Sequence, residues 1–114
     1  MAASALLASP VSVDLDFFRA NGYVVVPSQI PEALLDDAID AIWKFGQLDP
    51  DNPQTWYRTP ERANGLPELN GAGMVELYHH PALWATRQWP DVHTTFFTLW
   101  QTEALWVSID RCNF

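Results

Sequence analysis

The sequence predicts an α+β fold in which a layer of helices precedes and covers the first strands of a β-domain. Three observations predict it: amphipathic helical patterns recur along the chain, a run of strand-forming residues follows them, and helices come before sheet. Of the 114 residues, 48% are hydrophobic and only 18% are charged, which is typical of a chain that folds. We expect one domain, or part of one, over residues 14–114 and a disordered tail over residues 1–13.

The charge balance excludes several classes of function. Fourteen acidic and six basic side chains give a formal net charge of −8, which repels the phosphates of nucleic acids. The sequence has no run of Lys or Arg that would hold an anionic membrane surface. The opening stretch, MAASALLASP, lacks the basic start of a signal peptide, and the single cysteine, Cys112, excludes an internal disulfide framework. We therefore expect a cytoplasmic protein that binds neither nucleic acid nor membranes.

A short helix and a short strand are predicted near the start of the chain. The stretch DLDFFRANG, residues 14–22, has Asp14 as its N-cap and Gly22 as the residue that ends the helix. The run YVVVP that follows, residues 23–27, is rich in β-branched residues and stops at Pro27. It predicts a strand that is either buried on both faces or placed at the edge of a sheet.

Residues 28–46 form the clearest helical pattern. Ser28 or Gln29 precedes the helix. Pro31 lies near its first position and Gly46 ends it. One face is apolar and holds Leu34, Leu35, Ala38, Ile42 and Phe45. The opposite face is charged and holds Asp36, Asp37, Asp40 and Lys44. Because the charged residues point away from the packed face, they predict a solvated helix surface rather than a metal site.

The sequence loses its periodicity over residues 47–73, which are rich in Pro, Asn, Asp and Gly. This composition predicts a long loop. Two interpretations stay open: a lid over a binding site, or a surface excursion held down by Trp56 and Tyr57.

Two helices and two strands are predicted after the loop. Residues 74–78 predict a short strand. Pro81 and Pro90 each predict the start of a helix, because proline suits the first helical turn. Residues 105–114, LWVSIDRCNF, predict the last strand, since no Gly or Pro interrupts them.

The three histidines, His79, His80 and His93, do not predict a metal site. His79 and His80 are adjacent, so they point to opposite sides of an extended backbone, and no H-E-x-x-H pattern occurs. We expect the histidines to cap or pack around the helix that begins at Pro81. Cys112 has no His or Lys beside it in the sequence to activate its thiol, so we expect a small residue that packs in a strand.

The last predicted strand carries the candidate binding residues. Alternation places on one of its faces Leu105, Val107, Ile109, Arg111 and Asn113. This face begins apolar and becomes polar, and two interpretations stay open. It forms the mouth of a barrel, where Arg111 and Asn113 bind a carboxylate, or it marks the point at which the strand leaves the core for solvent.

Three segments of the sequence together resemble the N-terminal part of the phytanoyl-CoA dioxygenase family. They are DLDFFRANGYVVVPSQIPEALL, ELYHHPALWATRQWPDVHTTFFTLW and LWVSIDRCNF, and the resemblance spans residues 14–114. It implies N-terminal helices followed by a double-stranded β-helix, which is a cupin-like jelly roll. It also implies an Fe(II) site made by an H-x-D pair and a distal His, with 2-oxoglutarate as co-substrate for hydroxylation of a small molecule.

The chain departs from this family pattern because no H-x-D occurs in it. The resemblance implies that the iron ligands lie beyond Phe114. We therefore expect a truncated jelly roll that is inactive alone and binds neither iron nor 2-oxoglutarate stably. In the related ectoine hydroxylases, the Asn of an Arg-x-Asn on the equivalent strand contacts 2-oxoglutarate. The resemblance thus implies a cofactor contact at Asn113, and secondarily at Arg111.

The expected function is that of an oxidoreductase fragment, the N-terminal part of an Fe(II)/2-oxoglutarate-dependent dioxygenase that acts on an unidentified small molecule. Two alternatives stay open: a standalone binding or interaction module that uses exposed aromatic side chains, and a pseudoenzyme without an iron site. In the fragment interpretation, the unpaired last strand predicts self-association through its edge.

Overall fold

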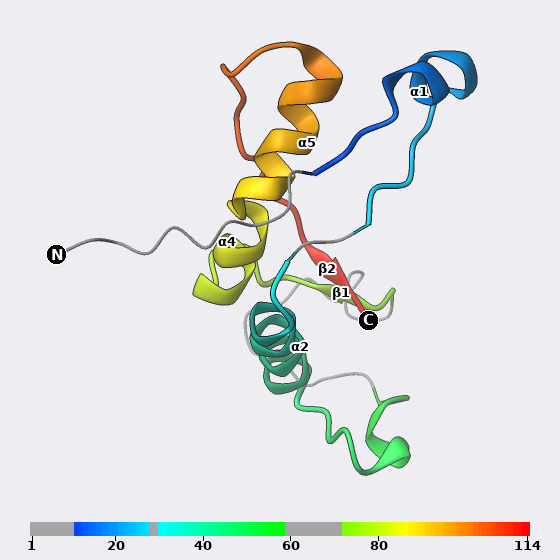
Figure 1. Cartoon of the computed structure of the whole chain (residues 1–114). Helices are drawn as coiled ribbons and strands as arrows, with labels where there is room; N and C mark the ends of the chain where they lie inside the picture. Colours follow the sequence, from blue (N-terminus) through cyan, green and yellow to red (C-terminus); the bar gives the residue numbers. More distant parts are fainter. Residues whose placement is uncertain (1–10, 28–29, 59–71) are drawn as a thin grey trace, which may run out of the picture. The chain divides into compact units, whose positions relative to one another are not determined.

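The computed structural model describes residues 11–27, 30–58 and 72–114, which form helices and a small antiparallel sheet (Figure 1). The elements in chain order are α1 (Leu15–Asn21), α2 (Glu32–Gly46), the 3-10 helix η1 (Pro53–Thr55), β1 (Met74–Val75), α4 (Pro81–Arg87), α5 (Pro90–Trp100) and β2 (Cys112–Asn113). The predicted α+β class is confirmed. The jelly roll stays a prediction, because a sheet of two strands is compatible with many architectures.

The contacts divide the chain into two units. The first unit consists of Met1–Ile30 and Gln88–Trp106, and it contains α1 and α5. The second unit consists of Pro31–Arg87 and Val107–Phe114, and it contains α2, α4 and the sheet. Residues 1–10 of the predicted disordered tail lie outside the described residues. None of the helices in the described ranges has the length and apolar character that a membrane crossing requires.

Helix α1, in the first unit, has both of its predicted caps. The carboxylate of Asp14 accepts a hydrogen bond from the backbone N–H of Phe17 at 2.9 Å. Gly22 ends the helix with a φ of 79°, and its N–H donates to the carbonyl of Phe18 at 2.8 Å. The helix fully buries none of its residues, so the caps contribute a large share of its stability.

Residues 23–27, also in the first unit, do not form the predicted strand. They have no ladder partner among the described residues, and the side chain of Val25 is 82% exposed. The prediction is wrong because β-branched residues favour a strand only where a neighbouring segment pairs with it and packs on it.

Helix α5 begins at Pro90, as predicted. Proline is suited to this first position because its missing N–H has no intrahelical partner there in any case. The helix ends at Gln101, which adopts a left-handed φ of 56° and donates its N–H to the carbonyl of Phe97 at 2.8 Å. The start of the helix therefore follows from local sequence, whereas its end uses a residue other than glycine.

Helix α2, in the second unit, corrects the prediction for Gly46. The helix begins directly after Pro31, and Gln47, with a φ of 54°, takes the left-handed position at its end. Gly46 is instead the last helical residue and is buried, and a Cβ on it would lie 2.9 Å from Cδ1 of Leu48. Its small size, rather than its backbone freedom, allows Leu48 to pack against the helix end. Residues 28–29 lie outside the described residues.

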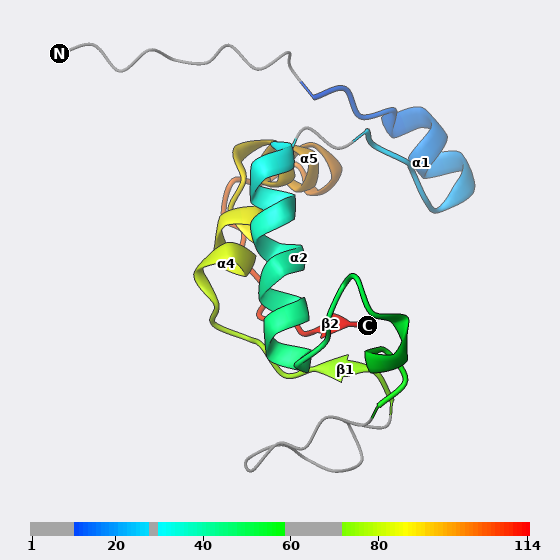
Figure 2. The same ribbon diagram turned by 90° about the horizontal axis from the view of Figure 1, so that it is seen from below.

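The charged face of α2 is exposed as predicted, but the predicted apolar face is wrong in part, because Leu35 is 37% exposed and the buried residue Ala41 was not assigned to that face. Asp36 and Asp37 are exposed, and Nζ of Lys44 lies 2.7 Å from a carboxylate oxygen of the exposed Asp40. The helix contacts α4 and β1 (Figure 2), and its contact with α4 borders the charged residues. The buried hydrophobic side chains among the described residues come from these three elements and are Ala41, Val75 and Leu83.

The loop after α2 is held down by one of the two predicted aromatic residues. The indole N–H of Trp56 donates to the carbonyl of Asp49 at 2.7 Å, and its ring lies 5.7 Å from that of Trp43 on α2. Tyr57 is 90% exposed and does not hold the loop. The start of the loop therefore runs over the surface and is held against α2 by Trp56. Residues 59–71, on which the lid interpretation depends, lie outside the described residues.

The sheet joins two distant segments of the second unit. Strands β1 and β2 run antiparallel, with Met74 opposite Asn113 and Val75 opposite Cys112. Both predicted strands exist, but each contributes only two residues to the ladder. Residues 105–111, the larger part of the last predicted strand, have no ladder partner in the described part of the chain. Propensity predicted where a strand forms, but the length of a ladder depends on both partners.

Candidate functional site

Asn113, the first predicted cofactor contact, lies in β2 and is exposed. The backbone N–H of its neighbour Phe114 donates to the carbonyl of Gly73 at 2.7 Å. In an antiparallel ladder the residues that exchange hydrogen bonds alternate with residues whose backbone groups point the other way. The N–H and C=O of Asn113 therefore face the edge of β2 that β1 does not cover.

Arg111 shares a sheet face with Asn113. The two residues are separated by one position, so their side chains lie on the same side of the extended segment. Nη1 of Arg111 lies 3.3 Å from the sulfur of Met74, the residue paired with Asn113. The Arg111 side chain thus crosses diagonally to β1 on the face that carries Asn113. Both predicted residues are exposed, and the structure brings them together on one surface.

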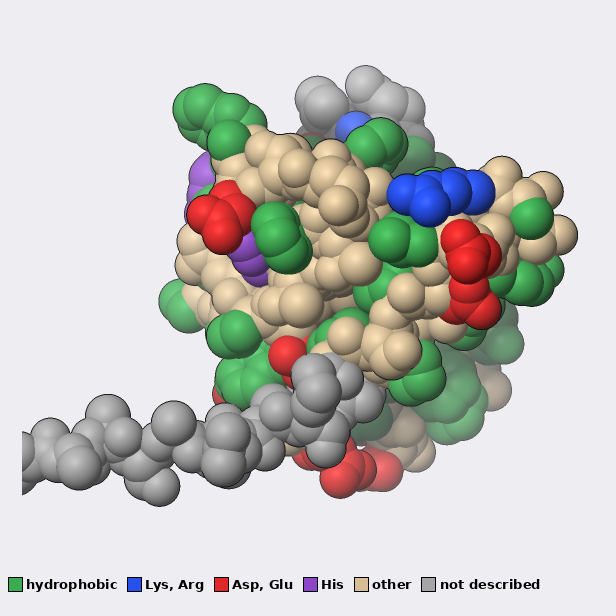
Figure 3. Space-filling view, turned by 45° about the horizontal axis from the view of Figure 1, so that its top comes forward, with side chains coloured by type: hydrophobic (Ala, Val, Ile, Leu, Met, Phe, Trp, Pro, Cys, Tyr) green, Lys and Arg blue, Asp and Glu red, His purple; other side chains and the backbone are tan. Residues whose placement is uncertain are grey.

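The apolar part of the predicted face does not form a packed layer. Val107 is 40% exposed and Ile109 is 52% exposed. Trp106, on the alternate face, is 99% exposed. The change from apolar to polar residues along this segment is therefore a feature of the surface within the described residues. Figure 3 shows hydrophobic side chains reaching the surface at several places on one face of the molecule.

The end of β2 is anchored by an aromatic contact and a glycine. The ring of Phe114 meets that of Trp43 on α2 edge-to-face, with the ring centres 5.1 Å apart. Gly73 has a φ of 71°, and a Cβ at this position would collide with the carbonyl oxygen of Phe114. These two contacts place the end of the chain segment that carries Asn113 against α2 and β1.

Arg87 is a residue that the sequence patterns did not single out as functional. It is the last residue of α4 and is half-buried. Its Nη1 donates to the carbonyl of Tyr78 at 2.7 Å, and its Nη2 donates to the carbonyl of Asp110. The guanidinium carbon lies 5.6 Å from the ring centre of Trp84. No local pattern reveals this role, because Tyr78 precedes α4 and Asp110 lies far along the chain.

His79 and His80, at the start of α4, cap and pack as predicted, but the prediction is wrong for His93, which lies in α5 and is exposed. Nδ1 of His80 accepts the N–H of Ala82 at 3.2 Å, and the carbonyl of His80 accepts the N–H of Leu83 at 3.0 Å. The ring of His79 stacks on that of Trp84, with the centres 6.2 Å apart. His80 thereby satisfies donors that the first turn of a helix leaves unpaired.

Cys112 occupies the strand position that the sequence predicts for it. It is half-buried, is paired with Val75 in the ladder and carries a free thiol. Within residues 11–27, 30–58 and 72–114, no three His, Cys, Asp or Glu side chains come close enough to hold a metal ion. The described residues therefore do not by themselves fit the iron ion that the family resemblance implies. The 2-oxoglutarate contacts at Asn113 and Arg111 stay predictions.

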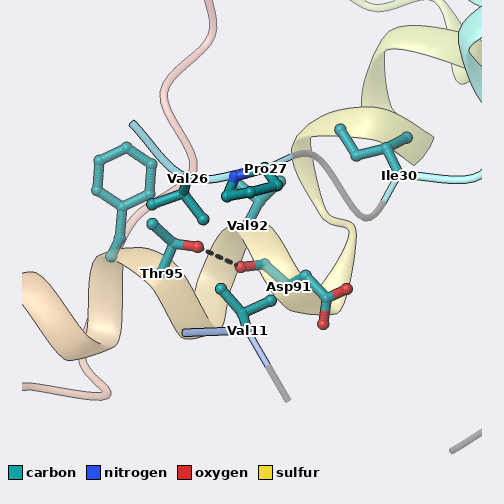
Figure 4. A pocket seen from close by; sticks show the side chains of 8 residues that line it. Val11, Val26, Pro27, Ile30, Asp91, Val92 and Thr95 are labelled. Carbon is teal, nitrogen blue, oxygen red and sulfur yellow. Dashed lines mark hydrogen bonds between the residues drawn. The ribbon is translucent and has the colours of Figure 1, made fainter. Parts of the chain in front are cut away.

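A pocket of about 240 Å³ lies within the first unit (Figure 4). It is lined by Val11, Val26, Pro27, Ile30, Asp91, Val92, Thr95 and Phe96. The Thr95 hydroxyl donates to the backbone carbonyl of Asp91 at 2.8 Å, so it is already engaged. Oδ2 of Asp91 is buried without a hydrogen-bond partner. The lining is therefore mainly apolar, and a molecule in the pocket would find few polar partners.

A second hollow of about 390 Å³ lies in the second unit, over the contact between α2 and α4. Its lining combines alanines with charged groups and consists of Asp37, Asp40, Ala41, Lys44, His80, Pro81, Ala82 and Ala85. The hydrogen bond from Lys44 to Asp40, and then the charge of that carboxylate, raise the pKa of Lys44. Lys44 and Asp40 thus pair with each other, and Asp37 adds a further negative charge to the lining.

We compared the chain with known protein families, curated proteins and solved structures. No protein-family model, no curated protein and no solved structure matches this chain.

Proposed function

We propose that this chain forms the N-terminal helical layer and the first strands of a non-haem Fe(II)/2-oxoglutarate-dependent oxygenase that hydroxylates a small molecule. The proposal begins from the resemblance of residues 14–114 to the phytanoyl-CoA dioxygenase family. Since the chain has no H-x-D, the iron ligands would come from polypeptide outside these 114 residues.

The observation that carries the proposal is the small sheet and its uncovered edge. Each strand contributes two residues, and the backbone groups of Asn113 face away from β1. A two-stranded sheet is marginally stable by itself, and three or more strands with a covered face are usually needed. A further strand on this edge would extend the sheet and place Asn113 and Arg111 inside a larger β-domain.

The distribution of apolar side chains supports the same proposal. Beside the sheet, Val107, Ile109 and Phe114 are 40%, 52% and 50% exposed. Burying apolar surface contributes about 25 cal/mol for each Å² removed from water, so strands that cover these residues would add to the stability of the domain.

The side chains of Asn113 and Arg111 suit the co-substrate of such an enzyme. The amide of Asn113 offers donors and an acceptor, and the guanidinium of Arg111 offers a planar fork that matches a carboxylate. 2-Oxoglutarate carries two carboxylates, and both residues share one face of the sheet. We rank Asn113 above Arg111 because the guanidinium already contacts the sulfur of Met74.

The decisive test is to determine the full sequence of the polypeptide that is encoded together with these residues and to search it for iron ligands. The proposal expects an H-x-D soon after the segment that carries Asn113, followed by a further His and an Arg. The complete protein, purified with Fe(II), should then convert 2-oxoglutarate to succinate, and Asn113→Ala should raise the KM for 2-oxoglutarate. The matched control is Asn52→Ala, which removes an amide from the cap of η1. An encoded protein without these iron ligands would rule the proposal out.

A non-catalytic interaction module is the second candidate, and one observation favours it. The aromatic side chains of Trp106 and Tyr57 are 99% and 90% exposed, and exposed aromatic residues are enriched where proteins bind partners. This candidate requires the 114-residue chain to be monodisperse in size-exclusion chromatography and to melt cooperatively. A chain that aggregates or pairs through the edge of β2 would favour the oxygenase proposal instead.

A further inference from the structure

The ladder between β1 and β2 ends although its register would allow further pairs. The pairs Met74–Asn113 and Val75–Cys112 define the register. Two positions further on, the same register would place Leu77 opposite Asp110. Because hydrogen-bonded pairs alternate along an antiparallel ladder, this pair would be a bonded one, with the carbonyl of Asp110 accepting from Leu77.

Arg87 takes that carbonyl instead. Its Nη2 donates to the carbonyl of Asp110, and its Nη1 donates at 2.7 Å to the carbonyl of Tyr78, one residue beyond Leu77. One guanidinium therefore binds a backbone carbonyl from each of the two segments, just past the last ladder pair. Its planar fork of five donors makes such a double contact possible, which a lysine ammonium cannot reproduce with the same geometry.

The Arg87 side chain is itself held in place. The residue is half-buried at the end of α4, and its guanidinium carbon lies 5.6 Å from the ring centre of Trp84, one turn earlier in the helix. Helix α4 packs on α2, and Leu83 beside Trp84 is only 5% exposed. The double contact of Arg87 with the carbonyls of Tyr78 and Asp110, which we call the clamp, is thus attached to a helix that packs on α2.

From this geometry we propose that Arg87 is a positioning residue that ends the β1–β2 ladder and sets the placement of Arg111 and Asn113. The carbonyl of Asp110 is fixed by Arg87, and Phe114 is fixed by Gly73. The two candidate 2-oxoglutarate contacts lie between these fixed points. Their assignment as cofactor contacts rests on the proposed function, whereas the clamp itself does not.

Amide hydrogen exchange measured by NMR tests the clamp on the 114-residue chain. Without Arg87, the segment loses a hydrogen bond to a charged donor, so Arg87→Met should speed exchange at Cys112 and Phe114 by at least about tenfold. Exchange in the middle of α2 should change far less. Arg87→Lys should restore part of the protection, because an ammonium still donates to a carbonyl. The matched control is Arg19→Met, which removes the same charge from an exposed residue of α1.

Three results would overturn the clamp. The first is exchange at Cys112 and Phe114 that is the same in Arg87→Met and wild type. The second is an equal loss of protection in β2 and α2, and the third is unfolding of Arg87→Met and Arg87→Lys alike. Either of the last two would make Arg87 a residue of general stability.

The link to the cofactor has a separate readout. In the complete oxygenase, Arg87→Lys should raise the KM for 2-oxoglutarate several-fold more than it lowers kcat, because positioning affects binding first. If Arg87→Lys had a normal KM for 2-oxoglutarate but fast amide exchange in β2, the clamp would be retained and its role in cofactor binding would be rejected. The absence of iron ligands in the encoded protein would reject the oxygenase and leave the exchange test valid.

Discussion

Gly73 and Gly22 both adopt positive φ angles, of 71° and 79°, but their surroundings differ. A Cβ on Gly22 would meet nothing within 4 Å, so only its backbone conformation disfavours a larger residue. A Cβ on Gly73 would in addition collide with the carbonyl oxygen of Phe114. The second position therefore combines a backbone requirement with a steric one.

Gly73→Ala should destabilise the protein more than Gly22→Ala. We expect a loss of about 1 kcal/mol for Gly22→Ala, from the left-handed conformation alone. Gly73→Ala should cost about 2 kcal/mol or more, because the ladder next to Phe114 must also shift. Urea unfolding followed by tryptophan fluorescence measures both values. Equal losses for the two variants would contradict the close approach at Gly73.

The ion pair between Lys44 and Asp40 gives a pH prediction with a definite sign. The hydrogen bond to Asp40 raises the pKa of Lys44 above its ordinary value of 10.5, so the charged amine is favoured in the folded state. Its contribution to stability is complete below the unfolded pKa and is lost as the pH rises through the higher folded pKa. The pair is exposed, so the effect is small.

Thermal melting of wild type and Lys44→Gln at a series of pH values checks this sign. The advantage of wild type should be constant at neutral pH and should shrink as the pH rises above 10.5. Lys44→Arg is the matched control, because its guanidinium stays charged over this range. An advantage of wild type that grows with pH would contradict the assignment.

At the level of elements, the helices differ in what stabilises them. Helix α2 is amphipathic and packs on α4 and β1, whereas α1 has seven residues and fully buries none. A helix of this length is marginal in water without tertiary contacts. The stability of α1 should therefore depend strongly on the cap at Asp14.

Asp14→Ala should unfold α1 selectively. Removal of an N-cap side chain costs about 1 kcal/mol, which is large for a helix that buries little. NMR chemical shifts of residues 15–21 report the helical population directly. Asp16→Ala is the matched control, because this side chain lies in the same turn and is 98% exposed, while the cap hydrogen bond is made by Asp14. If Asp16→Ala reduced helicity as much as Asp14→Ala, charge in the first turn rather than capping would hold α1.

At the level of the whole molecule, the buried hydrophobic residues of the described ranges belong to one unit. They are Ala41, Val75 and Leu83, and all three lie in the second unit. A core of this size contributes little stability compared with that of a complete domain. Single core substitutions should therefore have large consequences.

Leu83→Ala should remove a large part of the stability of the second unit. Leucine-to-alanine changes at buried sites cost about 2–5 kcal/mol, and Leu83 is 5% exposed. Leu35→Ala serves as the control, because Leu35 is 37% exposed and should cost far less. Guanidinium unfolding monitored by circular dichroism compares the two. A similar cost for both variants would indicate that the core is not centred on Leu83.

The features that the sequence predicted well are those that depend on near neighbours. Asp14 and Gly22 cap α1, and Pro90 opens α5, because each of these choices involves groups within a few residues. The pairing of Asp40 with Lys44 follows from the helical repeat in the same way. Of the candidate site, alternation predicted that Arg111 and Asn113 share a face.

Other features depended on partners that lie far away in the sequence, and only the tertiary structure decided them. Residues 23–27 have high strand propensity but no partner among the described residues, and the ladder of Asn113 stops where Arg87 takes the carbonyl of Asp110. The sequence by itself thus determined where the helices form, the caps of α1 and the exposed acidic residues of α2. The tertiary structure decided the length of the sheet and the surroundings of Asn113, because strand pairing needs a second segment whose position local chemistry does not specify.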